Sequence, residues 1–555
     1  MNLKLRIVNL GADVDASAGE SVADVYARIA PQIPFAPVCC RVNNKNEDLA
    51  YPIFAPKQIE FLGLAHPDGM RCYVRSLCLM LYRAVVTLYP GASLRMGNAV
   101  SGGYYFTLSC VEPTADNALA IKREMDSLVS RALPLTRCER PTEEVREMFR
   151  RQGLADKVKL LDTLADRLYS VYYMLDGIAD AGVGPMAPDT ASLAVFDIAA
   201  YEDGFLLMPP SASSGYRSAA AVIAQPKLFR AFTAYRGFNR IVGISTAADV
   251  NEAVRERRTD MMVNVAEALC SKYIREIADT VTSRFREGGA KVVLISGPSS
   301  SGKTTFTKRL AIELLTNLIK PVMISLDDYF VDRHTTPVDE NGELDYESLY
   351  ALDLELFNSH LVALTRGDEV ELPCYNFEQG CREYKNRRIR LAPDAILLIE
   401  GIHGLNPELT PELGEEMKYR IYVSALTCCA LDEHNWVSTT DTRLLRRIIR
   451  DYKYRGTSPL DTIRRWPSVR RGEERWIFPY QENADSIFNS SLLFELSVMR
   501  EEAERVLATL PRTCPEYATA TRLRRLLSYF APISTHQIPP TSLLREFLGG
   551  SSFRY

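Results

Sequence analysis

The fold of the second half of this 555-residue chain is decided by the stretch Lys291-Val292-Val293-Leu294-Ile295-Ser296-Gly297-Pro298-Ser299-Ser300-Ser301-Gly302-Lys303-Thr304. Its beginning is a short apolar, β-branched run, which is typical of a buried parallel strand. The remainder matches G-x-x-x-x-G-K-[ST], and Thr305–Leu318 behind it has a helical pattern. A strand, this loop and a helix in succession predict a P-loop, whose backbone N–H groups and helix N-terminus bind phosphate.

The loop residues predict an ATP site with an associated Mg²⁺ ion. Lys303 would act as a catalytic residue that reaches the β- and γ-phosphates, and the Thr304 hydroxyl would bind Mg²⁺. We expect ATP to be bound by Gly297, Pro298, Ser299, Ser300, Ser301, Gly302, Lys303, Thr304 and Thr305.

Two further predicted strands end in carboxylates. Pro321–Leu326 leads into Asp327 and Asp328, and the apolar run Ala395–Ile399 ends at Glu400. Because α/β folds assemble their sites at the carboxyl edge of the sheet, we expect a base for an acceptor hydroxyl at the first position. The second would be a Walker-B-like Mg²⁺ ligand. The alternatives are an aspartate pair that caps the following turn, and a glutamate that merely caps a strand end.

A predicted helix at Thr442–Lys453 has one apolar face and one basic face. Such a basic stripe can close over a transferring phosphoryl group as a lid and neutralise its charge. A solvated charged face is the alternative. The arginines of the stripe are Arg443, Arg446, Arg447 and Arg450.

Composition limits the classes of protein that the chain can belong to. A formal net charge of −4 gives no global attraction to nucleic acid or anionic membranes. No apolar run approaches the roughly 18 residues that a membrane span needs, and Met1–Leu10 lacks the apolar centre of a signal peptide. The twelve cysteines form no C-x-x-C pair that would suggest a zinc or redox motif. We therefore expect a cytoplasmic protein without membrane contact.

The length predicts several units, and we expect a multidomain α/β protein. Its second half would be a P-loop NTPase fold with a mostly parallel sheet. The predicted parts are a ubiquitin-sized α/β unit (1–63), a second α/β unit (64–225), a helical connector (226–288), the phosphotransferase unit (289–510) and a Pro-containing C-terminal tail (511–555). In the first unit we expect strands at Leu3–Val8, Val38–Val42 and Gln58–Leu62 and a helix at Val22–Ile29.

The second half resembles the uridine kinase and phosphoribulokinase family of P-loop kinases over about residues 290–500. The resemblance implies that Asp327 accepts the proton of the acceptor hydroxyl, and that the acceptor is bound by Asp345, Tyr375, Phe377 and Arg382. Besides the P-loop, it rests on Ser325-Leu326-Asp327-Asp328-Tyr329-Phe330, Pro373-Cys374-Tyr375-Asn376-Phe377, Ile399-Glu400-Gly401-Ile402 and Asp441-Thr442-Arg443-Leu444-Leu445-Arg446-Arg447.

One departure from the family concerns the acceptor. Uridine kinases have a histidine that reads the pyrimidine, and the aligned residue here is Gly380. A site that loses a polar partner loses discrimination, so another nucleoside or a different hydroxyl substrate is an open alternative. A phosphoribulokinase-like sugar phosphate is a further one. Its phosphate would bind to the basic run that contains Arg382, Lys385, Arg387 and Arg388, unless this run is a solvated hairpin tip.

The N-terminal half resembles the N-terminal region of threonyl-tRNA synthetase, a TGS-like domain followed by an editing-like domain. The resemblance rests on Leu88-Tyr89-Pro90-Gly91-Ala92, Gly102-Gly103-Tyr104-Tyr105-Phe106 and Asp180-Ala181-Gly182-Val183-Gly184-Pro185-Met186. Where the family has three histidines and a cysteine, this chain has Arg71, Arg75, Gly182 and Met186. The resemblance therefore implies a catalytically degenerate domain without editing or zinc. A contact with RNA or a nucleotide remains open, as does a purely structural role.

The leading interpretation is an ATP-dependent kinase with a small-molecule acceptor, most readily a nucleoside. The alternative is a nucleotide-switched P-loop protein with little kinase activity, whose N-terminal half binds RNA or a metabolite. Self-association into a homo-oligomer is expected only by analogy with the family.

Overall fold

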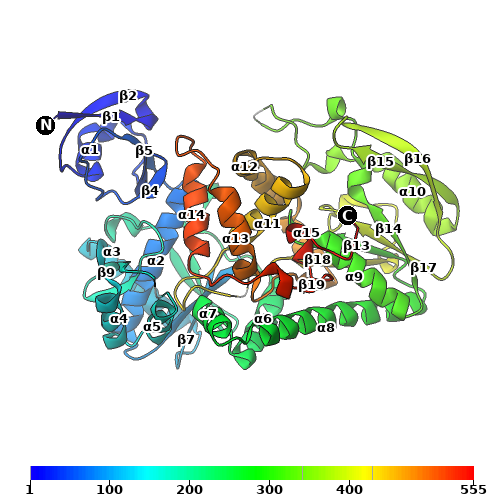
Figure 1. Cartoon of the computed structure of the whole chain (residues 1–555), viewed down its shortest axis with the longest axis horizontal. Helices are drawn as coiled ribbons and strands as arrows, with labels where there is room; N and C mark the ends of the chain where they lie inside the picture. Colours follow the sequence, from blue (N-terminus) through cyan, green and yellow to red (C-terminus); the bar gives the residue numbers. More distant parts are fainter. Residues whose placement is uncertain (1, 165, 341, 428, 555) are drawn as a thin grey trace.

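The computed structural model describes residues 2–164, 166–340, 342–427 and 429–554 of a multidomain α/β protein. Figure 1 shows the N-terminal unit at one end, the parallel sheet of the second half at the other, and the C-terminal segment between them. Within these ranges, no helix combines the length and the apolar character that crossing a membrane requires.

The N-terminal unit is a five-stranded sheet packed against one helix. The strand order is β2-β1-β5-β3-β4, and β1 and β5 are parallel. Ser21 and Asp24 form a capping box that begins the helix, and the predicted strands and helix of this unit are confirmed. The elements are β1 (Asn2–Ile7), β2 (Ala12–Ser17), α1 (Val22–Ile29), β3 (Cys39–Val42), β4 (Lys45–Glu47) and β5 (Gln58–Leu62).

The second unit surrounds the long helix α2 (Pro67–Leu88), which is buried along most of its length. It has two antiparallel sheets, ordered β10-β9-β8 and β11-β12-β7-β6. The other elements are β6 (Leu94–Val100), β7 (Gly103–Leu108), α3 (Ala115–Arg131), β8 (Thr136–Pro141), α4 (Thr142–Arg151), α5 (Ala155–Asp162), β9 (Tyr169–Leu175), β10 (Ile178–Ala181), β11 (Asp197–Tyr201) and β12 (Gly204–Met208).

Three helices follow: α6 (Pro226–Val242), α7 (Ala247–Arg255) and α8 (Thr259–Arg286). The second and third do not form a separate module. Val250 of α7 and Ile274 of α8 share one buried core with Phe306 of the helix behind the P-loop and Ile421 of the parallel sheet. The helical character predicted for this part is confirmed, and its helices support the sheet directly.

The second half contains a parallel five-stranded sheet of order β14-β17-β13-β18-β19. The two faces of its central strand β13 (Val292–Ser296) pack into different cores. Val293 and Ile295 lie in the core with α8 and α9, whereas Val292 and Leu294 lie in the core with α10. This double burial explains why the strand is a continuous apolar run. The other strands are β14 (Lys320–Ser325), β17 (Ala395–Glu400), β18 (Lys418–Ser424) and β19 (Ser486–Asn489).

Helices and one hairpin surround this sheet. The hairpin consists of β15 (Glu369–Asn376) and β16 (Cys381–Arg390). The helices are α9 (Lys303–Thr316), α10 (Leu354–Arg366), α11 (Thr439–Tyr454), α12 (Pro459–Trp476), α13 (Glu495–Leu507) and, in the tail, α14 (Tyr517–Leu527) and α15 (Arg545–Leu548). Tail residues such as Leu523 and Leu544 are fully buried in the same core as α8 and α9.

A buried ionic network joins the two halves of the chain. Lys157 of α5 lies 2.7 Å from Asp180 of β10 and 2.7 Å from Asp432 of the second half. His434 Nδ1 lies 2.7 Å from the other oxygen of Asp180. Because buried charges are costly unless they are paired, these four side chains fix how the halves fit together.

Candidate active site

The P-loop begins at a point of very close backbone approach. A Cβ atom at Gly297 would lie 1.9 Å from the carbonyl oxygen of Val423, so only glycine fits there. Gly302 begins helix α9 with a φ of +88°, a left-handed conformation that glycine adopts without strain. The loop therefore turns sharply enough to place its backbone N–H groups at the N-terminus of α9.

The polar groups of the loop favour an anionic ligand. The hydroxyls of Ser300 and Ser301 are buried, and neither has a hydrogen-bond partner among the described residues. The Lys303 Nζ donates to the carbonyl oxygens of Gly297 at 2.8 Å and Pro298 at 3.2 Å. Burial lowers the pKa of Lys303, while Glu400 and Asp327 nearby oppose this shift. A phosphate group would supply the partner that these donors need.

Thr304 and Glu400, the two residues predicted to bind Mg²⁺, are in contact. The Thr304 Oγ1 donates to Glu400 Oε1 at 3.1 Å, at the point where β17 ends beside the loop. Burial raises the pKa of Glu400 to about 7, and Lys303 opposes this shift. A hydroxyl and a carboxylate beside a phosphate site are the oxygen ligands that Mg²⁺ takes in nucleotide sites, so these residues fit that ion.

The two neighbouring aspartates face different groups. Asp327 lies open to solvent at the mouth of the site, where the surrounding protein raises its pKa and Lys303 opposes the shift. Asp328 lies instead against the β15–β16 hairpin, with an oxygen 3.9 Å from Arg387. Asp327 is thus the aspartate of the pair that interacts electrostatically with the loop lysine.

The arginine stripe of α11 is arranged differently from the prediction. Arg443 and Arg446 do not lie on an open face, because both are almost completely buried. Arg443 pairs with Glu473 of α12 and donates to the Ser299 carbonyl oxygen at 3.1 Å. Arg446 pairs with Glu495 at 2.5 Å and donates to the Ser301 carbonyl oxygen at 3.4 Å. Buried guanidinium groups must be paired, and these two brace the outer side of the P-loop.

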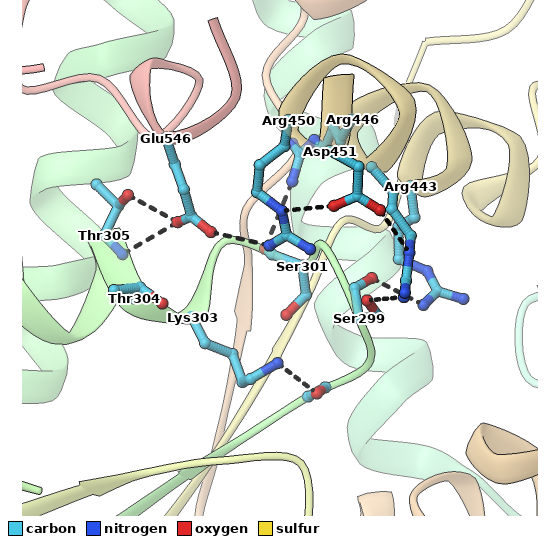
Figure 2. A network of polar contacts seen from close by, with 12 residues as sticks. Ser299, Ser301, Lys303, Thr304, Thr305, Arg443, Arg446, Arg450, Asp451 and Glu546 are labelled. Carbon is cyan, nitrogen blue, oxygen red and sulfur yellow. Dashed lines mark hydrogen bonds and ion pairs between the residues drawn. The ribbon is translucent and has the colours of Figure 1, made fainter. Parts of the chain in front are cut away.

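The other two arginines keep partial access to the site. Arg447 donates to the Ser299 hydroxyl at 2.8 Å, and Arg450 lies 3.7 Å from Glu546 of the tail (Figure 2). Burial lowers the pKa of Arg450 to about 10, so it remains charged at neutral pH. Of the four arginines in the stripe, these two have side chains that are partly exposed beside the loop.

The acceptor residues proposed from sequence lie around one aromatic cluster. The ring of Tyr375 lies 5.0 Å from that of Phe377 and 5.6 Å from that of Phe330. The Tyr375 hydroxyl is buried and has no hydrogen-bond partner among the described residues. Phe377 is largely exposed. An aromatic wall with an unsatisfied hydroxyl suits a flat or ring-shaped acceptor that carries a polar edge.

Two charged residues of the predicted acceptor site are held by the protein itself. Arg382 pairs with Asp353 at 2.7 Å, and Asp353 also caps helix α10. Asp345 accepts the backbone N–H of Glu347 at 3.1 Å, which fixes a turn beside the site. The charges of both residues are therefore partly engaged by contacts within the protein.

Gly380 occupies the turn of the β15–β16 hairpin with a φ of +72°. A Cβ atom there would lie 2.6 Å from Nε of Arg333, whose guanidinium donates to the Phe377 carbonyl oxygen at 2.7 Å. A histidine side chain would be strained at this position by both the backbone and the neighbour. Arg333 is thus the charged group that lies against the hairpin turn.

Sequence reasoning missed several charged residues of the site. Glu473 accepts the backbone N–H of Ser299 at 3.1 Å, and Glu546 accepts the backbone N–H of Thr305 at 3.2 Å. Each comes from a segment far along the chain, so no local pattern connects it to the loop. Arg333 comes three residues after Phe330, the end of the Asp327–Phe330 motif, and its basic charge there was the one available signal.

The substituted positions of the N-terminal half are engaged internally. Arg71 pairs with Asp68 at 2.7 Å, and Arg75 donates to the Pro185 carbonyl oxygen. A Cβ atom at Gly184 would lie 2.7 Å from the Arg75 guanidinium carbon, so arginine fills this place. The backbone N–H of Met186 donates to Asp48 of the N-terminal unit at 2.9 Å. The last of these contacts joins the second unit to the first.

The P-loop, the parallel sheet and the carboxylates at its edge define the second half as a P-loop nucleotide-binding domain. Residues 292–493 match the model of the Phosphoribulokinase / Uridine kinase family. Similar solved structures include a "possible uridine kinase" from Bacillus stearothermophilus, at 19% identity and a TM-score of 0.27 over 39% of this chain and 100% of that chain. A D-glycerate 3-kinase from Cryptococcus neoformans matches at 12% identity and a TM-score of 0.27, over 39% of this chain and 90% of that one.

The N-terminal region is similar to threonine–tRNA ligases. The ligase of Rubrobacter xylanophilus is 29% identical over 189 residues, which are 34% of this chain and 29% of the relative. The ligase of Desulforamulus reducens is 28% identical over 184 residues, which are 33% of this chain and 29% of the relative. The chain therefore matches less than a third of the length of these relatives.

Proposed function

We propose that the protein is an ATP-dependent kinase that transfers the γ-phosphoryl group to a hydroxyl of a small molecule, with a nucleoside as the first candidate. The observation that carries this proposal is the position of Asp327, which lies at the sheet edge within the electrostatic reach of Lys303. A base next to a phosphate-binding lysine is what transfer to a hydroxyl requires, and simple nucleotide binding does not need it.

In the proposed reaction the chain acts by positioning and by charge. The acceptor oxygen attacks the γ-phosphorus, its proton passes to the Asp327 carboxylate, and the bond to the bridging oxygen breaks to release ADP. Lys303 exchanges its loop carbonyls for the β- and γ-phosphates, and Arg447 and Arg450 neutralise charge from the α11 side.

Thr304 and Glu400 would hold Mg²⁺, directly or through its water shell. The ion would neutralise the phosphate charge that develops during transfer.

The acceptor would lie against Tyr375 and Phe377, with Asp345 and Arg382 at its polar edge. The Tyr375 hydroxyl offers an unsatisfied group for it. Arg333 beside Gly380 adds a cation where pyrimidine kinases are expected to have histidine. A cation at this position supports a substrate whose edge carries several hydrogen-bond-accepting atoms, such as a purine nucleoside or a sugar.

The test is an ADP-release assay with ATP and Mg²⁺ against uridine, cytidine, purine nucleosides and simple sugars. Asp327→Asn should lower turnover of the productive acceptor by about 100-fold or more, since a positioned base contributes about 10²–10⁴-fold. Its matched control is Asp328→Asn, which changes a neighbouring carboxylate that faces Arg387. We expect the control to keep most activity, and both variants to bind ATP normally. Equal loss in both variants would remove the base role from Asp327.

The second candidate is a nucleotide-switched binding protein. The buried network of Lys157, Asp180, Asp432 and His434 favours it, because this network connects the N-terminal half rigidly to the nucleotide-binding half. Arg71 and Arg75 are engaged internally, so an RNA contact would use other residues. Fluorescence anisotropy with labelled tRNA, with and without ATP, tests this candidate. A nucleotide-dependent affinity with no acceptor phosphorylated would support it over the kinase.

A further inference from the structure

Glu546, in the C-terminal tail, lies against the first turn of the P-loop helix. Its Oε2 accepts the backbone N–H of Thr305 at 3.2 Å and the Thr305 hydroxyl at 2.8 Å. Both donors belong to a residue that the sequence assigns to ATP binding. Figure 2 shows the Glu546 carboxylate between Thr305 and Arg450, above the loop that carries Lys303. A carboxylate here makes the contacts that a helix N-terminus offers to a phosphate oxygen.

The charges around Glu546 support the same interpretation. Its other oxygen lies 3.7 Å from Arg450, one of the two α11 arginines that keep access to the site. Its negative charge also acts on Lys303. Glu546 therefore interacts with three groups assigned to ATP, Thr305 from the sequence and Arg450 and Lys303 from the proposed reaction. The hydroxyls of Ser300 and Ser301 have no hydrogen-bond partner among the described residues, so the tail covers only part of the phosphate site.

The segment that carries Glu546 is firmly docked. Leu543, Leu544 and Phe547 are fully buried, and the Phe547 ring centre lies 5.2 Å from the Arg446 guanidinium carbon. Lys453 of α11 donates to the Leu548 carbonyl oxygen at 2.8 Å. The position of Glu546 is thus fixed by apolar packing on α11, and this packing holds its carboxylate at the loop.

We propose that Glu546 is an autoinhibitory carboxylate that occupies part of the phosphate site, and that ATP binds by displacing it and taking over Thr305 and Arg450. This inference rests on the proposed function only in that ATP is the ligand of the loop. On this proposal the phosphate contacts raise the affinity for ATP, and the docking of residues 543–549 lowers it.

The first measurement compares ATP affinity in the full-length wild-type protein and in Glu546→Gln by calorimetric titration with MgATP. Glutamine keeps the size and an acceptor oxygen but removes the charge that competes with phosphate. We expect about tenfold tighter binding, because charge-assisted hydrogen bonds are roughly twice as strong as neutral ones and tenfold corresponds to about 1.4 kcal/mol. The matched control is Glu516→Gln, which removes a tail glutamate that pairs with Arg464 at 3.0 Å, away from the loop. It should bind ATP as the wild type does.

The second measurement follows displacement directly, by hydrogen exchange of the wild-type protein with and without MgATP. Faster exchange of the amides of 543–549 in the presence of ATP supports displacement. Unchanged or slower exchange of these amides overturns the proposal. If the Glu546 carboxylate stays in place, the Thr305 donors are not free to bind phosphate. Equal ATP affinity of the wild type and Glu546→Gln also overturns it.

These outcomes are separate from those that test the kinase. Normal ATP binding with no acceptor phosphorylated contradicts the proposed function alone, whereas unaltered affinity in Glu546→Gln contradicts the autoinhibitory contact alone.

Discussion

Glu347 lies beside the proposed base at the edge of the P-loop. Its side chain packs so closely on α12 that a Cβ atom at Gly472 would lie 2.3 Å from the Glu347 Cβ. Burial raises its pKa from 4.5 to about 7; Arg447 opposes this shift, while Glu473 and Asp327 add to it. Near neutral pH this carboxyl is therefore only partly ionised, close to the groups that would handle phosphate.

This shift makes the stability of the protein depend on pH. Between pH 4.5 and 7 the folded state holds the Glu347 proton more tightly than the unfolded chain does, so stability falls as pH rises through this window. Glu347→Gln stays neutral at every pH. We expect it to raise the free energy of unfolding at pH 8 by on the order of 1–2 kcal/mol, and to leave it unchanged near pH 4.5.

Urea unfolding at the two pH values measures this effect. The matched control is Glu343→Gln, an exposed glutamate of the same segment, for which we expect no pH-dependent difference. A gain that is equal at both pH values would mean that packing, and not charge, is responsible.

At the scale of single residues, the site could be predicted where local pattern carries the information. Lys303, Thr304 and Glu400 follow directly from the P-loop and a strand end, and the Thr304–Glu400 contact is as close as the shared sheet edge implies. The buried ion pairs of Arg443 and Arg446 could not be predicted in this way. Their partners lie 30 and 49 residues along the chain, and a basic helical stripe looks the same whether its face is open or covered.

At the scale of elements, the β15–β16 hairpin carries three of the residues proposed to bind the acceptor, Tyr375, Phe377 and Arg382. Gly380 and Gly342 both have positive φ, +72° and +78°, but a Cβ atom at Gly342 would meet nothing within 4 Å. Gly380→Ala causes both backbone strain and a clash with Arg333. We expect each substitution to cost about 1 kcal/mol or more of stability, with the larger loss for Gly380→Ala.

Urea unfolding compares the two alanine variants, and acceptor KM reports on the hairpin. Only Gly380→Ala should raise KM, because only it displaces the arginine that borders the acceptor. Equal losses of stability and equal KM values would show that Arg333 moves aside without consequence.

The elements themselves were well predicted where they are regular and buried. Three strands of the parallel sheet lie within one residue of the predicted limits at both ends, since continuous apolar runs between helices are distinctive. The tail was harder to place. Its last helix has only four residues, Arg545–Leu548, and its position depends on packing against α11, which a linear pattern does not encode.

At the scale of the whole molecule, Lys157 and Lys159 offer a direct comparison. They lie two residues apart on α5, but Lys157 is buried between Asp180 and Asp432, whereas Lys159 is partly exposed and pairs with Asp249 at 2.6 Å. Lys157→Met would leave two buried carboxylates without their cation. We expect a loss of about 3–5 kcal/mol, against about 0–1 kcal/mol for Lys159→Met.

Thermal unfolding followed by calorimetry measures both variants. Lys157→Met should also separate the transitions of the two halves, because the network that joins them is lost. A single unchanged transition in Lys157→Met would show that apolar packing alone holds the halves together.

The shared core of the second half bears on how such a chain could be assembled from older parts. The matched family segment covers residues 292–493, but the buried core also takes in Leu160 and many residues between Ile244 and Leu548 that lie outside this segment. A genetic exchange that moved only the matched segment would leave the apolar faces of α8 and α14 uncovered. The unit that can fold after recombination is therefore larger than the segment that sequence comparison recognises. Recombination that preserves the fold must transfer the flanking helices together with that segment.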